Sequence, residues 1–272
     1  MGLVLAACGA NSSDKVGAAA SATAKKGGTL TVLSSSTDIN WDPAKSQSLP
    51  ITSLPLVHRR LVGLRLVEGK PVELVGDLAN DTGKVSEDGL TWTFTMKDGL
   101  KWSDGSDLTA KDFEYSFKRL ACPDTAAPYG ETVVGMIDGY EDAIGNPDAD
   151  GNTTTDPDWD TLNVHASEDG KTLTVQLSYP CSYFDKLCAF AAMSPVQQAT
   201  VEANGDAWCT QPDTFVCNGP YMISDSDPLR AYCSVQEPEL RRRLGFLQDR
   251  FRHHHPAPAR GLQRCLRRLQ QR

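Results

Sequence analysis

The sequence has no long apolar run and few histidines, and each absence removes a class of protein. No segment approaches the roughly 20 consecutive apolar residues that span a bilayer, so the body of the chain is predicted to hold no transmembrane helix. Five histidines are present, and Gly-x-Ser-x-Gly, His-Glu-x-x-His and phosphate-binding Gly-rich motifs are missing. His58 and His165 are isolated in the sequence. We therefore predict no enzyme activity, no catalytic site, no cofactor and no metal.

Lysine is absent from residues 228–272, and this absence separates two regions of opposite charge. The segment holds eleven arginines and three acidic residues, whereas the residues before it hold 16 basic and 32 acidic residues. We interpret residues 228–272 as a basic tail translated out of frame, because GC-rich codons in a shifted frame yield Arg, Pro, Ala and Gly. The change in charge supports this interpretation by itself.

Two other interpretations of this tail stay open. A basic helix at residues 240–247 could contact nucleic acid or an anionic membrane. His253, His254 and His255 could bind a metal, but three adjacent histidines cannot all face one ion and no cysteine or carboxylate lies at ligand spacing. The out-of-frame interpretation ranks first, the basic binding tail second and the metal site last.

The start of the chain resembles the processing site of a bacterial lipoprotein. Residues 5–9 read Leu-Ala-Ala-Cys-Gly, a lipobox in which Cys8 receives the lipid, so residues 1–8 are predicted to be a truncated signal peptide. Residues 9–27 are rich in Ala, Ser, Thr and Gly, which predicts a flexible tether. The alternative is a chance Ala-Ala-Cys, because the apolar run before Cys8 is shorter than the roughly 7–15 residues of an export signal.

Strand patterns recur along the body of the chain. From Gly28 apolar residues alternate with threonines, and residues 91–96 alternate more clearly, with Trp92, Phe94 and Met96 on one face. Alternation at residues 173–177 marks another strand. Together with the helices predicted elsewhere in the chain, these strands predict an α/β or α+β fold.

Two helices have recognisable ends. Thr109 is a predicted N-cap with Asp112 as its capping-box partner, and Phe113, Phe117 and Leu120 then share one face. Ser194-Pro195 with Gln197 predicts the start of a second helix, and Asn204-Gly205 predicts its end.

An acidic segment at residues 146–151 matches the first half of a calcium-binding loop. Its twelfth position is Pro157, where a bidentate glutamate is required, and no flanking helix pair is evident. We therefore interpret the segment as a solvated turn, with a calcium site as the weaker alternative.

Residues 85–120 carry the most specific signal in the sequence. They read VSEDGLTWTFTMKDGLKWSDGSDLTAKDFEYSFKRL, with flanking motifs Asn-Trp-Asp-Pro at 40–43, PDTAAPY at 123–129 and Asn-Gly-Pro-Tyr at 218–221. This order of motifs resembles the family 5 solute-binding proteins of bacterial ABC importers, and within them the oligopeptide binders. The resemblance covers residues 28–224.

The resemblance implies a fold and a domain organisation. It implies a periplasmic-binding-protein-like α/β fold of the class II, cluster C type, in which two lobes close on a ligand. The first lobe would have a mixed-sheet core at residues 28–44 and 166–227 and an appended α+β subdomain at residues 45–165. The second lobe, which follows the Asn-Gly-Pro-Tyr motif in the family, is expected to be missing.

The resemblance also implies a function. The expected role is an extracytoplasmic, lipid-anchored receptor that delivers oligopeptides to an ABC permease, located on the outer face of the cell membrane or in the periplasm of a Gram-negative cell. Its partners would be a peptide, the permease subunits and the membrane, without nucleic acid, and this chain would be a non-functional fragment. The alternative is a single-lobe interaction protein whose Arg-rich tail contacts nucleic acid or anionic membrane.

Three ligand contacts are implied by the same resemblance. Gln47 and Leu49 follow the Asp-Pro motif, and Tyr129 ends the Pro-Tyr motif, at positions that border the family's cleft. Gln47 stands where the family usually has an acidic residue. For Tyr129 the alternative is a packed surface aromatic.

Cysteine use allows disulfides in an exported protein. Beyond Cys8 and the two cysteines of the tail, five remain: Cys122, Cys181, Cys188, Cys209 and Cys217. Cys209 with Cys217, or Cys181 with Cys188, would close short loops.

Overall fold

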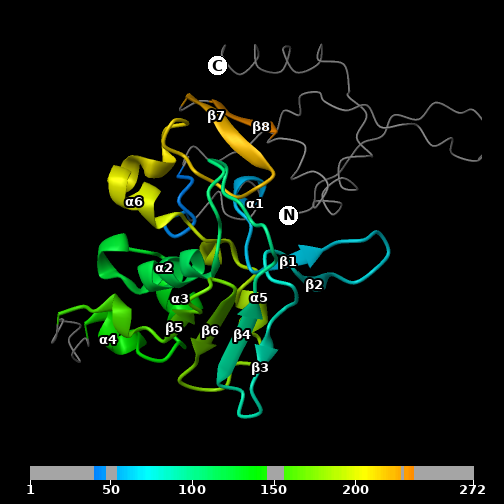
Figure 1. The fold of residues 1–272 in the computed structure, drawn as a ribbon, viewed down its shortest axis with the longest axis vertical. Coiled ribbons are helices and arrows are strands. Elements are labelled where there is room, and N and C mark those ends of the chain that lie inside the picture. The colour runs from blue at the N-terminus through cyan, green and yellow to red at the C-terminus, as the bar shows by residue number, and fades with distance from the viewer. Residues whose placement is uncertain (1–39, 47–53, 146–155, 228–229, 236–272) are drawn as a thin grey trace, which may run out of the picture. The chain divides into compact units, whose positions relative to one another are not determined.

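The structure is a computed structural model, and it describes residues 40–46, 54–145, 156–227 and 230–235, with side chains through residue 223 (Figure 1). All of these residues belong to one unit of the chain, Ser34–Arg250. Several predictions fall outside the described residues: the lipobox at Cys8, the tether, the strand from Gly28, Gln47, Leu49, the acidic loop at 146–151 and the tail beyond residue 235.

The described chain alternates short helices with short strands. The α-helices are α1 (Leu54–Val57), α2 (Ala110–Ala121), α3 (Gly130–Val134), α4 (Tyr140–Ile144), α5 (Phe184–Leu187) and α6 (Gln198–Asn204). The 3-10 helices are η1 (Pro123–Thr125), η2 (Trp159–Thr161), η3 (Ala191–Met193) and η4 (Gly205–Cys209). The strands are β1 (Val62–Arg65), β2 (Glu73–Gly76), β3 (Lys84–Val85), β4 (Thr91–Thr95), β5 (Val164–Ala166), β6 (Thr172–Gln176), β7 (Tyr221–Asp227) and β8 (Arg230–Val235). None of these helices combines the length and the apolar character needed to cross a bilayer.

The largest sheet has four antiparallel strands in the order β3-β4-β6-β5. Register places Phe94 opposite Leu173 and Trp92 opposite Val175, and all four side chains are buried on one face. Figure 1 shows α2 and α3 beside this sheet, and α2 packs on β5 and β6. The strands predicted at residues 91–96 and 173–177 are therefore confirmed. The alternating threonines face away from the core, as expected of an antiparallel sheet covered on one side.

The sheet also tests the expected layout of the lobe. Every strand pairing among the described residues is antiparallel, so the expected mixed sheet is not found in this part of the chain. The expected boundary between residues 165 and 166 falls inside β5, which pairs with β6. A boundary there would divide a continuous hydrogen-bonded sheet, and the division of the lobe stays a prediction.

Helix α2 begins where its capping residues predict. Thr109 Oγ1 accepts a hydrogen bond from Lys111 N at 3.3 Å, and Asp112 Oδ2 accepts one from Thr109 N at 2.7 Å. This reciprocal arrangement satisfies backbone donors that a helix start leaves open. Phe113 and Phe117 are fully buried, with their rings edge to face at 6.2 Å. The predicted cap and apolar face are confirmed.

Helix α6 starts later than predicted. Ser194 is extended and its Oγ donates to Ala191 O at 2.7 Å, so the hydroxyl serves η3 instead of capping a following helix. Val196 N donates to Ser116 Oγ on α2 at 2.8 Å, which holds the next residues in a non-helical path. The helix begins at Gln198, and its predicted end at Asn204-Gly205 is confirmed.

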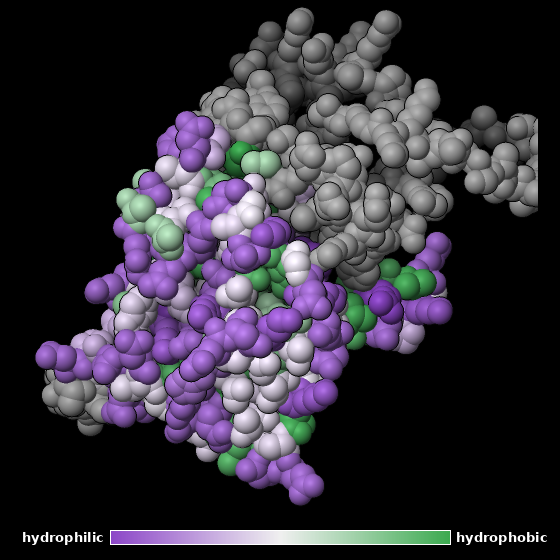
Figure 2. Space-filling model, viewed as in Figure 1, coloured by the Kyte–Doolittle hydropathy of each residue, from purple (hydrophilic) through white to green (hydrophobic). Residues whose placement is uncertain are grey.

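Buried apolar residues form two clusters. We call the first the sheet core, which includes Trp92, Phe94, Phe113, Phe117, Leu173, Val175 and Phe184. We call the second the motif core, which comprises Trp41, Leu54, Val57, Ala191, Val196, Trp208, Cys209, Phe215, Cys217 and Ile223. The described surface is otherwise mostly hydrophilic on the face shown in Figure 2, with apolar side chains exposed on the β1–β2 hairpin, among them Leu64 and Val72.

Candidate ligand-binding site

The Asn-Trp-Asp-Pro motif is anchored by a buried ion pair. Arg119 Nη1 donates to Asp42 Oδ1 at 3.0 Å and Arg119 Nη2 donates to Asp42 Oδ2 at 2.6 Å. Both residues are buried, so the paired, planar geometry compensates two charges removed from water. Burial opposes the charge on Arg119, but the hydrogen bonds that it donates to Asp42 and the Asp42 charge outweigh burial and raise the guanidinium pKa.

The same motif binds its own backbone and the turn after α6. Asp42 Oδ1 accepts from Ala44 N at 2.9 Å, and Asn40 Oδ1 accepts from Asp42 N at 3.0 Å. Cys209 Sγ donates to Asn40 Oδ1 at 3.4 Å, which links the motif to η4. Burial and the nearby Asp42 charge raise the pKa of the Cys209 thiol to about 12, so the thiol stays protonated. Contacts with Arg119 on α2 and with Cys209 on η4 thus hold residues 40–46 in place.

His58 is a structural residue of the motif core. Its Nε2 lies 3.1 Å from Trp41 O, and its ring meets Phe215 edge to face at 5.6 Å and Trp208 at 6.3 Å. Burial lowers the His58 pKa to about 4, against the smaller opposing effects of the Trp41 carbonyl and Asp42. The imidazole is therefore neutral near pH 7 and holds the chain after α1 against the motif.

The late Asn-Gly-Pro-Tyr motif closes onto α1. Gly219 N donates to Val57 O at 2.7 Å, and Asn218 Oδ1 accepts from Arg59 N at 2.8 Å. A Cβ at position 219 would lie 2.3 Å from the Val57 carbonyl carbon, so only glycine permits this approach. The late motif is thus joined to α1 and Arg59, and His58 in turn joins the chain after α1 to Trp41 of the early motif.

Of the three predicted ligand contacts, the structure describes Tyr129. Tyr129 is half-buried at the N-cap of α3, and its ring meets Phe190 edge to face at 5.1 Å. It packs on the sheet core, as a packed surface aromatic does. Its place at the border of a peptide cleft stays a prediction, as do the contacts assigned to Gln47 and Leu49.

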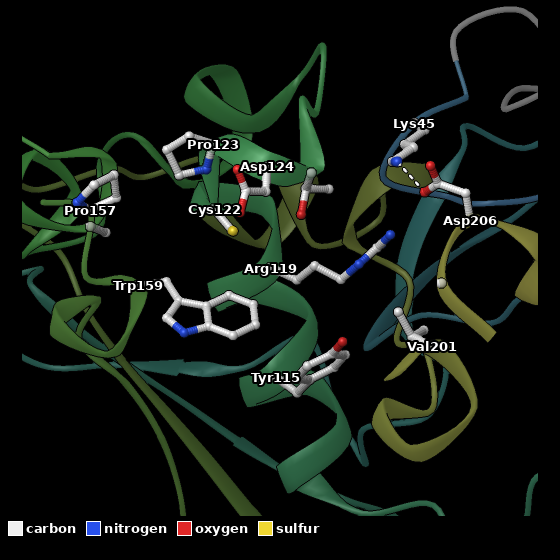
Figure 3. A pocket seen from close by; sticks show the side chains of 13 residues that line it. Lys45, Tyr115, Arg119, Cys122, Pro123, Asp124, Pro157, Trp159, Val201 and Asp206 are labelled. Atoms are coloured by element: carbon white, nitrogen blue, oxygen red, sulfur yellow. Dashed lines mark hydrogen bonds and ion pairs between the residues drawn. The ribbon is translucent and has the colours of Figure 1, made fainter. Parts of the chain in front are cut away.

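A cavity of about 610 Å³ opens beside Arg119 (Figure 3). Tyr115 and Trp159 line it with their rings 5.9 Å apart and inclined by 69°. Lys45 Nζ and Asp206 Oδ1 pair at its rim at 2.6 Å. The remaining lining comes from Cys122, Pro123, Asp124, Thr125, Ala143, Pro157, Val201 and Gly205. Tyr129 is not among these residues, so the predicted ligand contact at Tyr129 lies outside the lining of this cavity.

The predicted disulfides are not formed in the structure. Cys181, Cys188 and Cys209 are thiols, so neither the Cys181–Cys188 nor the Cys209–Cys217 bridge is present. Cys188 is fully buried, and burial raises its pKa well above the ordinary value. Cys209 Sγ instead contacts Asn40, and Cys217 Sγ lies 3.4 Å from Tyr221 O. These cysteines are packed as small core side chains.

No group of three or more His, Cys, Asp or Glu side chains within residues 40–46, 54–145 and 156–223 is arranged to hold a metal ion. His165 is exposed and its Nε2 lies 2.9 Å from Asn163 Oδ1.

Sequence reasoning missed the partner of Asp42. Arg119 lies three residues after Ser116 and one before Leu120, so it follows the buried side of α2. An arginine on the side of a helix that is expected to be buried needs an acidic partner. Together with an aspartate inside a separate motif, it is the signal that could have suggested the pair. Nothing local to either segment indicates which acid among 35 would be chosen.

Comparison with known proteins identifies the family. The sequence profile described as bacterial extracellular solute-binding proteins, family 5 Middle, matches residues 73–235. The periplasmic oligopeptide-binding protein OppA of Salmonella typhimurium is 38% identical over 188 residues, which cover 68% of this chain and 31% of OppA. The dipeptide-binding protein of Lactococcus lactis is 40% identical over 139 residues, which cover 51% of this chain and 23% of that protein.

Solved structures agree with this assignment. The murein tripeptide binding protein MppA of Escherichia coli has a TM-score of 0.57 at 35% identity, over 69% of this chain and 34% of MppA. The matched part of this chain thus covers 23% to 34% of the length of these relatives, and its fold is periplasmic-binding-protein-like. The matched segment runs through residue 235 and includes β8, and the tail boundary at residue 228 stays a prediction. The chain belongs to the bacterial extracellular solute-binding proteins, family 5, a family of binding proteins and not of enzymes.

Proposed function

We propose that this chain is part of an extracytoplasmic receptor that delivers oligopeptides to an ABC permease. The observation that carries the proposal is the family match over residues 73–235 combined with relatives named for oligopeptide, dipeptide and murein tripeptide binding. The anchoring of residues 40–46 by Arg119 supports it, because this segment leads directly into the predicted contacts Gln47 and Leu49. Peptide recognition would use backbone pairing with an extended ligand.

The membrane attachment in this proposal rests on Cys8. A lipid on this thiol would place the receptor on the outer face of the cell membrane, with residues 9–27 as its tether. Incorporation of radiolabelled palmitate into the chain expressed in a Gram-positive host, and its loss in Cys8→Ser, tests the attachment. Equal labelling of both chains would contradict it.

The division of this lobe into two parts also remains a proposal. The continuous sheet of β3, β4, β6 and β5 supports a boundary after Gln176 in place of residue 166. The appended subdomain would then hold all four strands of this sheet together with α2.

This chain alone is expected to bind peptides poorly, because the groups that hold the peptide amino terminus in the family are expected outside the matched segment. A chimaera tests the function directly. Residues 40–227 replace the corresponding segment of the Salmonella typhimurium OppA, and calorimetry measures binding of a mixed pool of tripeptides to pentapeptides. The chimaera should bind the pool, whereas the 272-residue chain should not.

Tyrosine variants of the chimaera sharpen the test. Tyr129→Ala should weaken peptide binding by about tenfold if Tyr129 borders the cleft, since truncation of a buried aromatic contact costs more than 1 kcal/mol. Tyr179→Ala is the matched control, because Tyr179 is 54% exposed. A folded chimaera that binds no peptide would overturn the proposal, and equal loss in both variants would remove the role of Tyr129.

A further inference from the structure

The residues found to line the cavity beside Arg119 all belong to the described part of this chain. They come from α2, η1, α4, η2, α6 and η4, and from the segments at Lys45 and Pro157. A peptide cleft shared by two lobes needs residues from both, whereas this cavity needs none beyond residue 206. Its volume falls in the range of small-molecule sites. Occupancy of this cavity therefore does not depend on the proposed peptide function.

The charges on the cavity wall are compensated except for one. Arg119 is neutralised by the two hydrogen bonds to Asp42, and Lys45 is paired with Asp206 at 2.6 Å. Asp124 is exposed and forms no ion pair with another described residue. The lining therefore carries one carboxylate without an ion-pair partner, and this negative charge favours binding of a cation over binding of an anion.

Two aromatic rings form a corner in the same cavity. Tyr115 comes from α2 and Trp159 from η2, and Figure 3 shows both side chains directed into the space below Cys122 and Arg119. The faces of indole and phenol rings attract cations, and quaternary ammonium ions are recognised by such rings. The half-buried Val201 adds an apolar wall that suits the carbon atoms of an organic ion.

We propose that this cavity binds a small organic ammonium ion, with the charged nitrogen between Trp159, Tyr115 and the Asp124 carboxylate. The ligand's apolar carbons would lie against Val201, and the Lys45–Asp206 pair would border the entrance.

A pair of probes that differ in charge tests this proposal on the whole chain. Choline is the cation, and 3,3-dimethylbutan-1-ol is its neutral isostere with the same shape. Calorimetry should show choline binding about tenfold more tightly than the alcohol, the ratio expected when a ring face and a carboxylate contact a desolvated ammonium. Choline should also change the tryptophan fluorescence, and Trp159→Phe should abolish that change.

Variants separate the charge from the shape of the cavity. Asp124→Asn should weaken choline binding by about fivefold and leave the alcohol unaffected, because it removes the free charge alone. Glu87→Gln is the matched control, since Glu87 is an exposed acid that does not line the cavity. Circular dichroism checks that each variant is folded. Equal affinity for the two probes, no choline binding, or an unchanged affinity in Asp124→Asn would each overturn the proposal.

Discussion

The sheet core and the motif core are both buried clusters, but different kinds of contact hold them together. The sheet core is built from apolar side chains on β4, β6 and α2, and cross-strand pairs such as Phe94 with Leu173 bring them together. The motif core is accompanied by buried polar groups: the Asp42–Arg119 ion pair, and His58, whose ring meets Trp208 and Phe215. Short helices and loops supply most of the motif core, and side-chain hydrogen bonds and the ion pair hold these segments together.

This difference shows which kind of contact fixes the position of a chain segment in the fold. Apolar packing tolerates substitutions that keep volume, whereas a buried ion pair with fixed geometry accepts one partner and one register. The segment with the predicted ligand contacts leads out of the motif core. We infer that the backbone path of this segment depends more on polar contacts than on the apolar surface area that it buries.

Removal of one partner of the buried ion pair should give the largest effect. Arg119→Met leaves Asp42 charged and buried, so the free energy of unfolding should fall by about 3–5 kcal/mol. Urea unfolding followed by circular dichroism measures the loss. The double variant Asp42→Asn with Arg119→Met should lose less than Arg119→Met alone. A loss below about 1 kcal/mol in the single variant would show that the pair is not buried as described.

Acidification should destabilise the motif core next. Burial lowers the His58 pKa to about 4, below its unfolded value of 6.5, so the folded state favours the neutral ring. This stability is present above pH 6.5 and is lost as the pH falls from 6.5 toward 4. From pH 7 to 4.5 the His58 contribution to the free energy of unfolding should fall by about 2 kcal/mol.

A His58→Gln variant isolates this contribution, because carboxyl groups elsewhere titrate equally in both chains. Urea unfolding of both chains at the two pH values gives the difference. An identical pH dependence in the variant would mean that His58 is already protonated or exposed in the folded state.

Loss of the α2 cap should have the smallest effect of the three. Thr109→Ala removes the side-chain acceptor of the capping box beside the sheet core, and the free energy of unfolding should fall by about 1 kcal/mol. Thr109→Ser keeps the hydroxyl and should stay close to the parent chain. A loss in Thr109→Ala as large as that in Arg119→Met would reverse the contrast between the two regions.

The local pattern around α2 was predictable in detail, and α6 shows the limit of such reasoning. The cap at Thr109 and the face of Phe113 and Phe117 depend on residues three and four positions apart, so the sequence states them directly. Ser194 has the same capping chemistry, yet its hydroxyl bonds backward to Ala191. The competing contact between Val196 and Ser116 spans 80 positions and cannot be seen in a local window.

By itself, the sequence determined the family, the alternating strands of the sheet core, and the start and apolar face of α2. These features depend on short-range periodicity and on a long, specific motif. Only the tertiary structure decided that Asp42 pairs with Arg119, 77 positions away, that Gly219 closes onto Val57, and that Cys209 contacts Asn40 and forms no bridge. The physical reason is that a buried charge or donor takes whichever partner the folded chain brings within about 3 Å, and that partner is set by topology.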